Sequence, residues 1–104
     1  MKRGEVWWAN LPSPIGKRPV LLLSRDEAYS VRNAVTVAEV TRTIRDIPVE
    51  VPLGPEDGLP KKCAANLDTL MTIRKELLIE RITLLRSEKM SEVQKALKFA
   101  LDLG

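Results

Sequence analysis

Two side chains in this sequence, Arg18 and Thr41, have the chemistry needed to hold a phosphate group. Arg18 opens the apolar run Arg18–Ser24, and Thr41 closes a second run, Ala34–Thr41. A guanidinium offers planar pairs of N–H donors that match phosphate oxygens, and a threonine hydroxyl adds a further donor. We therefore predict that Arg18 and Thr41 act together on a phosphate.

The chain contains no histidine, and this absence excludes several kinds of catalytic site. Imidazole is the commonest general acid or base, and it is also the usual partner that activates a cysteine nucleophile. With a single cysteine and no histidine, the ligands of a typical zinc site are missing. Neither a P-loop nor a Gly-x-Gly-x-x-Gly fingerprint is present. The residues predict phosphate binding or phosphoryl chemistry, with no metal and no other cofactor.

RNA allows such chemistry with little catalytic machinery, because its 2′-hydroxyl is a nucleophile placed next to the scissile phosphate. Negative charge grows on the phosphoryl oxygens during the attack, and each well-placed donor there lowers the barrier by roughly 3–4 kcal/mol. Without histidine, the general base is either weak or an unusual group.

Positive charge is concentrated in one part of the chain. The formal net charge is +3, from 17 Lys and Arg and 14 Asp and Glu. The segment 17–45 alone carries this excess, because it contains Lys17, Arg18, Arg25, Arg32, Arg42 and Arg45 against Asp26, Glu27 and Glu39. A local basic patch of this kind is typical of a surface that binds a polyanion.

The chain length of 104 residues is enough for one modest hydrophobic core, so we predict a single domain over residues 1–104. The one cysteine, Cys63, cannot form an intrachain disulfide, which is typical of a reducing compartment. Glu5 interrupts the N-terminus before any signal-peptide core, and no apolar run is long enough to cross a bilayer. We expect a cytoplasmic protein that does not bind a membrane.

Short apolar runs between proline- and glycine-rich turns predict a series of strands. They fall at Gly4–Asn10, Arg18–Ser24, Val35–Thr41, Ile47–Val51, Cys63–Asn66, Thr69–Ile73 and Ile79–Leu84. Trp7 and Trp8 should lie on opposite faces of the first strand, because side chains alternate. Pro19 places the start of its strand near an edge, and Pro48 suggests that its strand is an edge strand.

The C-terminal segment Ser87–Leu103 has a different pattern. Met90, Val93, Leu97 and Leu101 recur at helical spacing and predict an amphipathic helix with these residues towards the core. Ser87 is the predicted N-cap, and Gly104 the predicted end. Several short strands and one closing helix predict a β-rich α+β fold with a strongly bent sheet or small barrel.

Several segments together resemble the MazF/PemK family of endoribonuclease toxins. They are Arg3–Leu11, Lys17–Ser24, the strand end Val40-Thr41, Asn66–Leu70 and the C-terminal amphipathic helix, and they occur in the family's order. The most specific feature is the Arg-Pro-Val strand start at Arg18 combined with the Val-Thr strand end at Thr41. The resemblance extends over essentially the whole chain.

The resemblance implies a small SH3-like barrel (MazF/PemK/CcdB-like) with a C-terminal amphipathic helix, assembled as a homodimer. It implies sequence-selective, metal-independent cleavage of single-stranded RNA, with 2′,3′-cyclic phosphate and 5′-hydroxyl products, and neutralisation by a cognate MazE-like antitoxin protein. The family's catalytic arginine and threonine fall on Arg18 and Thr41. Its RNA-binding positions fall on Pro12, Ser13, Lys17, Arg42, Thr43, Asp68 and Thr69.

Two departures from the family pattern concern the choice of RNA sequence. The first loop is shorter than in many members, and Thr69-Leu70-Met71 stands where many members have Gln-Ile-Arg or Gln-Val-Lys. Two other functions remain open at this point. One is a CcdB-like toxin that binds DNA gyrase without cleaving a substrate, and the other is an RNA-binding module without turnover.

Overall fold

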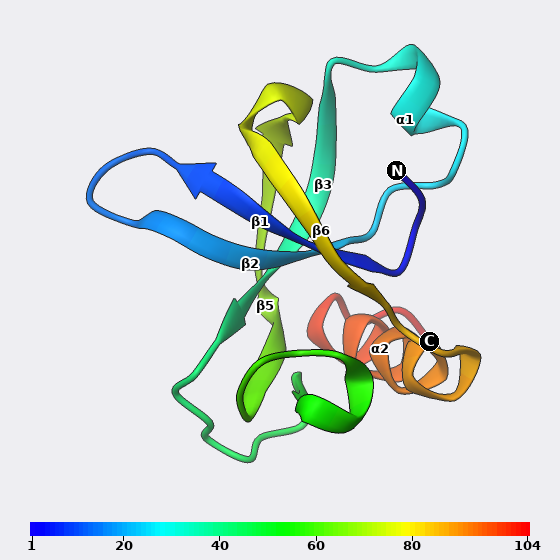
Figure 1. Cartoon of the computed structure of the whole chain (residues 1–104). Helices are drawn as coiled ribbons and strands as arrows, with labels where there is room; N and C mark the ends of the chain where they lie inside the picture. Colours follow the sequence, from blue (N-terminus) through cyan, green and yellow to red (C-terminus); the bar gives the residue numbers. More distant parts are fainter.

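A curled antiparallel sheet forms most of the computed structural model, which describes all 104 residues (Figure 1). The six strands lie in the order β4-β5-β3-β2-β1-β6. Their bounds are β1 Glu5–Leu11, β2 Gly16–Leu22, β3 Ala34–Thr41, β4 Glu50–Leu53, β5 Cys63–Arg74 and β6 Leu78–Leu84. Two helices, α1 Ala28–Val31 and α2 Ser87–Ala100, and two 3-10 turns, η1 Pro55–Asp57 and η2 Lys75–Leu77, complete the fold.

The curl of the sheet lets both of its faces bury apolar side chains. Successive residues of a strand point to opposite faces, so Leu21 packs in one apolar cluster and Leu22 in the other. The first cluster also receives the inner face of α2, and the second lies within the opposite side of the curled sheet. The sequence around Leu21 is therefore continuously apolar, as expected for a strand that is buried on both faces.

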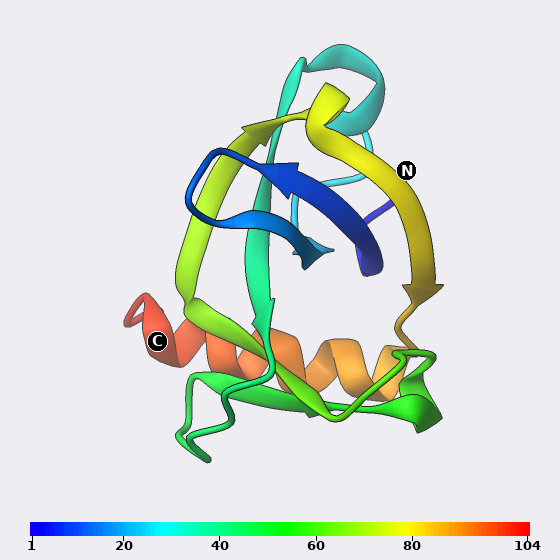
Figure 2. The same ribbon diagram turned by 60° about the vertical axis from the view of Figure 1, so that its left-hand side comes forward.

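Helix α2 packs across β4 and β5 at one end of the sheet (Figure 2). Val93 is 0% exposed, Met90 and Leu97 are partly buried, and Leu101 is 50% exposed. The prediction that Leu101 faces the core is therefore wrong, because the helix ends at Ala100 before another inward turn is completed. No helix of the structure combines the length and the apolar character of a membrane-spanning segment.

The helix start also differs from the prediction. Arg86, with an extended backbone, is the N-cap, and its carbonyl accepts the hydrogen bond of the Met90 N–H. The Ser87 hydroxyl instead donates to Glu88 at 2.9 Å, so it caps no backbone group.

One prediction about strands is wrong for a reason of pairing. The predicted strands Cys63–Asn66 and Thr69–Ile73 form one strand, β5, because a bulge lets both halves pair with β3. Strand β2 lies between β1 and β3, but its start pairs only with β1, so Pro19 lies near an open edge as predicted. Pro19 is tolerated there because β2 pairs with β3 only from Val20 onward.

A tight contact at Gly58 positions the loop that follows η1. Gly58 has φ +96°, and the Thr83 hydroxyl donates to the neighbouring Asp57 carbonyl at 2.9 Å. A Cβ atom on Gly58 would overlap the Thr83 hydroxyl. Gly16 also has a positive φ of +74°, but a Cβ there would meet no atom within 4 Å.

We predict that Gly58→Ala lowers the free energy of unfolding by about 2–4 kcal/mol, because it adds a steric overlap to backbone strain. Gly16→Ala is the matched control and should cost roughly 1–2 kcal/mol, from backbone strain alone. Urea unfolding followed by circular dichroism measures both. Equal losses in the two variants would contradict the role given to the Thr83 contact.

Candidate active site

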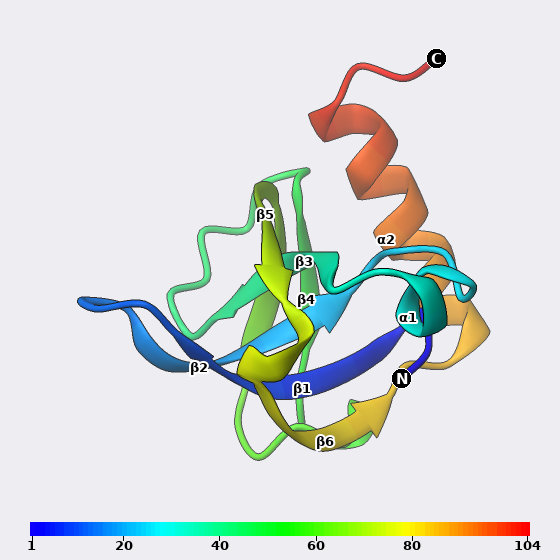
Figure 3. The same ribbon diagram turned by 90° about the horizontal axis from the view of Figure 1, so that it is seen from above.

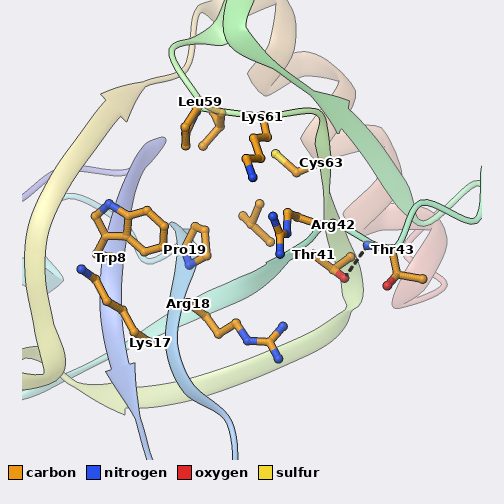
Figure 4. Close-up of a pocket in the computed structure, with 12 residues that line it drawn as sticks. Trp8, Lys17, Arg18, Pro19, Thr41, Arg42, Thr43, Leu59, Lys61 and Cys63 are labelled. Atoms are coloured by element: carbon orange, nitrogen blue, oxygen red, sulfur yellow. Dashed lines mark hydrogen bonds between the residues drawn. The ribbon is translucent and has the colours of Figure 1, made fainter.

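A basic pocket of about 660 Å³ opens where the start of β2 meets the end of β3 (Figure 4). The loop between η1 and β5 forms its remaining wall. Its lining contains four cationic side chains and no carboxylate. The twelve lining residues are Trp8, Lys17, Arg18, Pro19, Val40, Thr41, Arg42, Thr43, Leu59, Pro60, Lys61 and Cys63.

Arg18 lies in β2 opposite Ala9 of β1, beyond the part of β2 that pairs with β3. Its side chain is 44% exposed, so it is accessible to a ligand. Its Nη1 atom lies 3.7 Å from Oε1 of Glu39, a neighbour on β3. The strand fixes the direction of the side chain, while its N–H donors stay available.

Thr41 is the last residue of β3, and its hydroxyl oxygen accepts the backbone N–H of Thr43 at 3.1 Å (Figure 4). This bond orients the hydroxyl and leaves its own proton free to donate. In Figure 4 the Arg18 side chain extends from β2 below Thr41, away from Lys61 and Leu59. The pocket thus brings together the two residues that the sequence singled out.

Three further cations line the same pocket. Arg42 and Lys61 point into it from opposite walls (Figure 4). Lys17 places its Nζ atom 5.0 Å from the centroid of the Trp8 ring, which is a cation–π distance. Four positive charges around one opening attract a polyanion.

Trp8, Pro19 and Leu59 give the pocket an apolar side. Trp7 lies on the opposite face of β1, as predicted, where it packs against the core and its indole N–H donates to Glu5 at 2.9 Å. Trp8 is therefore the tryptophan whose ring is available to a ligand in the pocket.

Cys63 also lines the pocket, but it is a poor nucleophile. Burial raises the pKa of its thiol above the ordinary value, and the carboxylates of Asp57 and Glu56 raise this pKa further. The thiol therefore stays protonated at neutral pH, and only a thiolate attacks readily.

The predicted RNA-binding residues fall in three places. Lys17, Arg42 and Thr43 line the pocket with Arg18 and Thr41. Pro12 and Ser13 lie instead in a shallow hollow at the loop between β1 and β2, which projects away from α2 (Figure 3). Asp68 and Thr69 lie in the bulge of β5, next to the pairing of Glu39 with Asn66, and line neither opening.

The sequence did not reveal two charged neighbours of this site, Lys61 and Glu39. Lys61 follows a proline-rich loop that the antiparallel pairing of Thr41 with Ala64 brings over the pocket. Glu39 appeared only as one acidic charge in a basic segment. Its position two residues before Thr41 on the same strand was the available signal, because it places both side chains on one face.

The family of the chain follows from comparison with known proteins. Residues 2–101 match the family model described as "PemK-like, MazF-like toxin of type II toxin-antitoxin system". The chain is 40% identical to "Probable endoribonuclease MazF5" of Mycobacterium tuberculosis over 96% of this chain and 92% of that protein. It is 36% identical to "Probable endoribonuclease MazF2" of the same species, over 94% and 95% respectively.

Solved structures with the same fold include toxins of this kind. "Mycobacterium tuberculosis toxin MazF-mt6" is 30% identical and superposes with a TM-score of 0.89 over 96% of this chain and 98% of that one. An "Endoribonuclease in complex with its cognate antitoxin from Mycobacterial species" is 28% identical, with a TM-score of 0.89 over 100% and 97%. Family model, relatives and fold agree with the expected curled sheet and C-terminal helix. The chain therefore belongs to the PemK-like, MazF-like toxins of type II toxin–antitoxin systems.

Proposed function

We propose that the chain cleaves single-stranded RNA at selected sequences, without a metal ion, by attack of the 2′-hydroxyl on the adjacent phosphate. Membership of the MazF/PemK family makes it an RNA-cleaving toxin. One observation carries the finer proposal: Arg18 and Thr41 line the same pocket, with three further cations and no carboxylate in its lining.

Arg18 is proposed to bind two phosphoryl oxygens through its planar N–H donors, and Thr41 to donate its free hydroxyl proton beside them. As the 2′-oxygen attacks, charge builds on these oxygens, and both donors then bind more strongly than they do in the ground state. The 5′-oxygen leaves on the opposite side. The products are a 2′,3′-cyclic phosphate and a 5′-hydroxyl.

Other residues are proposed to hold the RNA on either side of the cut. Lys17, Arg42 and Thr43 contact backbone phosphates within the pocket, and Trp8 offers a ring on which a base stacks. Pro12, Ser13, Asp68 and Thr69 lie outside the pocket and are proposed to contact flanking nucleotides. Phosphate contacts position the strand, whereas contacts to base edges select the sequence.

Incubation of the purified protein with mixed single-stranded RNA and excess EDTA tests this function. Fragments that accumulate in EDTA support the proposal. RNA that is retained intact on the protein would indicate a binding module, and RNA that is neither cut nor retained would favour a CcdB-like toxin acting on DNA gyrase. Cleavage that requires added Mg²⁺ would contradict the metal-free mechanism.

The proposed partners are those of a toxin in this family. A cognate MazE-like antitoxin would neutralise the protein, and the basic pocket suits an acidic segment of such a partner, since opposite charges speed and orient association. Action on cellular RNA places the proposed activity in the cytoplasm.

We expect the protein to form a homodimer, because closed two-fold pairing is the commonest assembly. Phe99, Leu101 and Leu103 leave apolar surface exposed at the end of α2, which a second copy can cover. Light scattering at micromolar concentration should give twice the chain mass of 11.7 kDa. A monomeric mass together with full nuclease activity would contradict the dimer.

A further inference from the structure

We infer that Glu39 is the general base of the proposed reaction, the group that removes the proton of the attacking 2′-hydroxyl. This inference rests on the proposed function and deepens it. The chain has no histidine for this task, and the residues proposed so far, Arg18 and Thr41, stabilise charge but do not accept a proton.

Glu39 lies on the face of β3 that carries Thr41. The two residues are two positions apart on one strand, so their side chains project from the same side. The Glu39 carboxylate also lies 3.7 Å from the Arg18 guanidinium, and its side chain is 21% exposed. Its neighbours in the sheet are uncharged, since Glu39 pairs with Val20 on β2 and with Asn66 on β5. Arg18 is therefore its one charged partner.

The separation of Arg18 and Glu39 suits two groups that share a substrate. An N–H···O hydrogen bond spans 2.7–3.2 Å, so at 3.7 Å the pair attracts without using up an Arg18 donor. The attacking hydroxyl and the phosphoryl oxygens of RNA are a few ångströms apart. Glu39 does not line the pocket itself but lies beside Arg18 at its rim. A carboxylate just beyond hydrogen-bond reach of the guanidinium can therefore meet that hydroxyl while Arg18 holds the phosphate.

Glu39 differs from the other carboxylates that are shielded from solvent in the hydrogen bonds that it accepts. Only four acidic side chains of the chain are not exposed, namely Glu5, Glu39, Glu50 and Asp57. Glu5 accepts the indole N–H of Trp7, while Glu50 and Asp57 accept backbone N–H groups of their loops. Glu39 accepts no hydrogen bond from the chain, and its one ion pair is the 3.7 Å contact with Arg18, so both of its oxygens stay available to a ligand.

The proton balance of the step is simple. The 2′-oxygen forms a bond to phosphorus as its proton passes to the Glu39 carboxylate, and the bond from phosphorus to the 5′-oxygen breaks. The leaving 5′-oxygen takes a proton from solvent on the far side of the phosphate, because in-line attack places it away from the base. Glu39 then returns its proton to water, and no water molecule is consumed.

Glu39→Gln tests this role, because the amide keeps the shape of the side chain but cannot accept the proton. In single-turnover cleavage the rate should fall by about 10²–10⁴-fold. The Kd for a 2′-deoxy RNA analogue, which is not cleaved, should change by less than about threefold. The acid limb of the wild-type pH–rate profile should disappear, and the residual rate should rise with hydroxide throughout. Glu39→Asp, which moves the carboxylate back by one methylene, should lie between wild type and Glu39→Gln.

Glu92→Gln is the matched control, since Glu92 is an exposed carboxylate on α2 that pairs with Lys89 at 3.9 Å. It should leave both rate and Kd unchanged. A folded Glu39→Gln protein that cleaves at the wild-type rate would overturn the inference, and so would one that cleaves faster and binds more tightly. In either case, cleavage by the wild-type protein would still support the proposed function. A higher rate with tighter binding would mean that the ion pair with Glu39 limits the action of Arg18 on the RNA. Cleavage of the 2′-deoxy analogue by wild type would overturn both.

Discussion

An RNA that carries hydrogen in place of the 2′-hydroxyl at the nucleotide 5′ of the cut should resist cleavage completely. In the proposed mechanism this hydroxyl is the nucleophile, and neither histidine nor an activated cysteine is present to replace it. Single-turnover assays on a fluorescent oligonucleotide with one deoxy position measure the effect. The loss should exceed that of any change to the protein.

Binding of the same oligonucleotide should survive. In the proposed mechanism Lys17, Arg42 and Lys61, which line the pocket, hold phosphates, and these contacts do not depend on the 2′-hydroxyl. Affinity should fall steeply as salt rises, because neutralised phosphates release counterions. A deoxy substitution one nucleotide further from the cut is the control and should permit cleavage. Efficient cutting at the deoxy position would show that water or a protein group is the nucleophile.

Arg18→Ala should lower the cleavage rate by about 10³–10⁵-fold, the range found when an arginine that stabilises phosphoryl charge is removed. Its side chain is 44% exposed and makes no hydrogen bond within the fold, so thermal unfolding should change little. Single-turnover cleavage and circular dichroism, measured on the same preparation, separate the two effects.

Arg18→Lys should also be strongly impaired, because an ammonium group cannot hold two oxygens in a planar fork. Arg74→Ala is the control, since Arg74 is another exposed arginine paired with a glutamate, Glu76, at 3.3 Å. It lies at the far end of β5 and should leave cleavage intact. A folded Arg18→Ala protein with near-normal activity would remove Arg18 from the mechanism.

Local patterns in the sequence were sufficient for much of the fold. Apolar runs and turn residues gave most of the strands to within a few positions, and helical spacing gave α2 with Val93 at its centre. The presence of Arg18 and Thr41 in one pocket was also predictable, since each lies at a strand end and their side chains suit one ligand. These features depend on residues close together in sequence.

The ends of α2 were misjudged locally, at Ser87 and Leu101, but the other errors arose where distant pairing decides the outcome. The bulge in β5 joins two predicted strands because β3 offers one continuous partner, and it leaves Asp68 and Thr69 outside the pocket. Lys61 reaches the pocket only because β5 folds back on β3. The role proposed for Glu39 depends on its contact with Arg18, which lies on a different strand. The spacing of Glu39 and Thr41 along β3 indicates a shared face, but no local pattern encodes the contact of Glu39 with Arg18 or the place of Lys61.

Identification of the cleaved ends tests the central claim most directly. An RNA oligonucleotide with one cleavage site is incubated with the protein and excess EDTA, and the products are analysed by ³¹P NMR and mass spectrometry. We predict one fragment that ends in a 2′,3′-cyclic phosphate and another that begins with a 5′-hydroxyl. A 5′-phosphate with a free 3′-hydroxyl would mean that water attacks the phosphate, and it would contradict the mechanism built on Arg18, Thr41 and the 2′-hydroxyl.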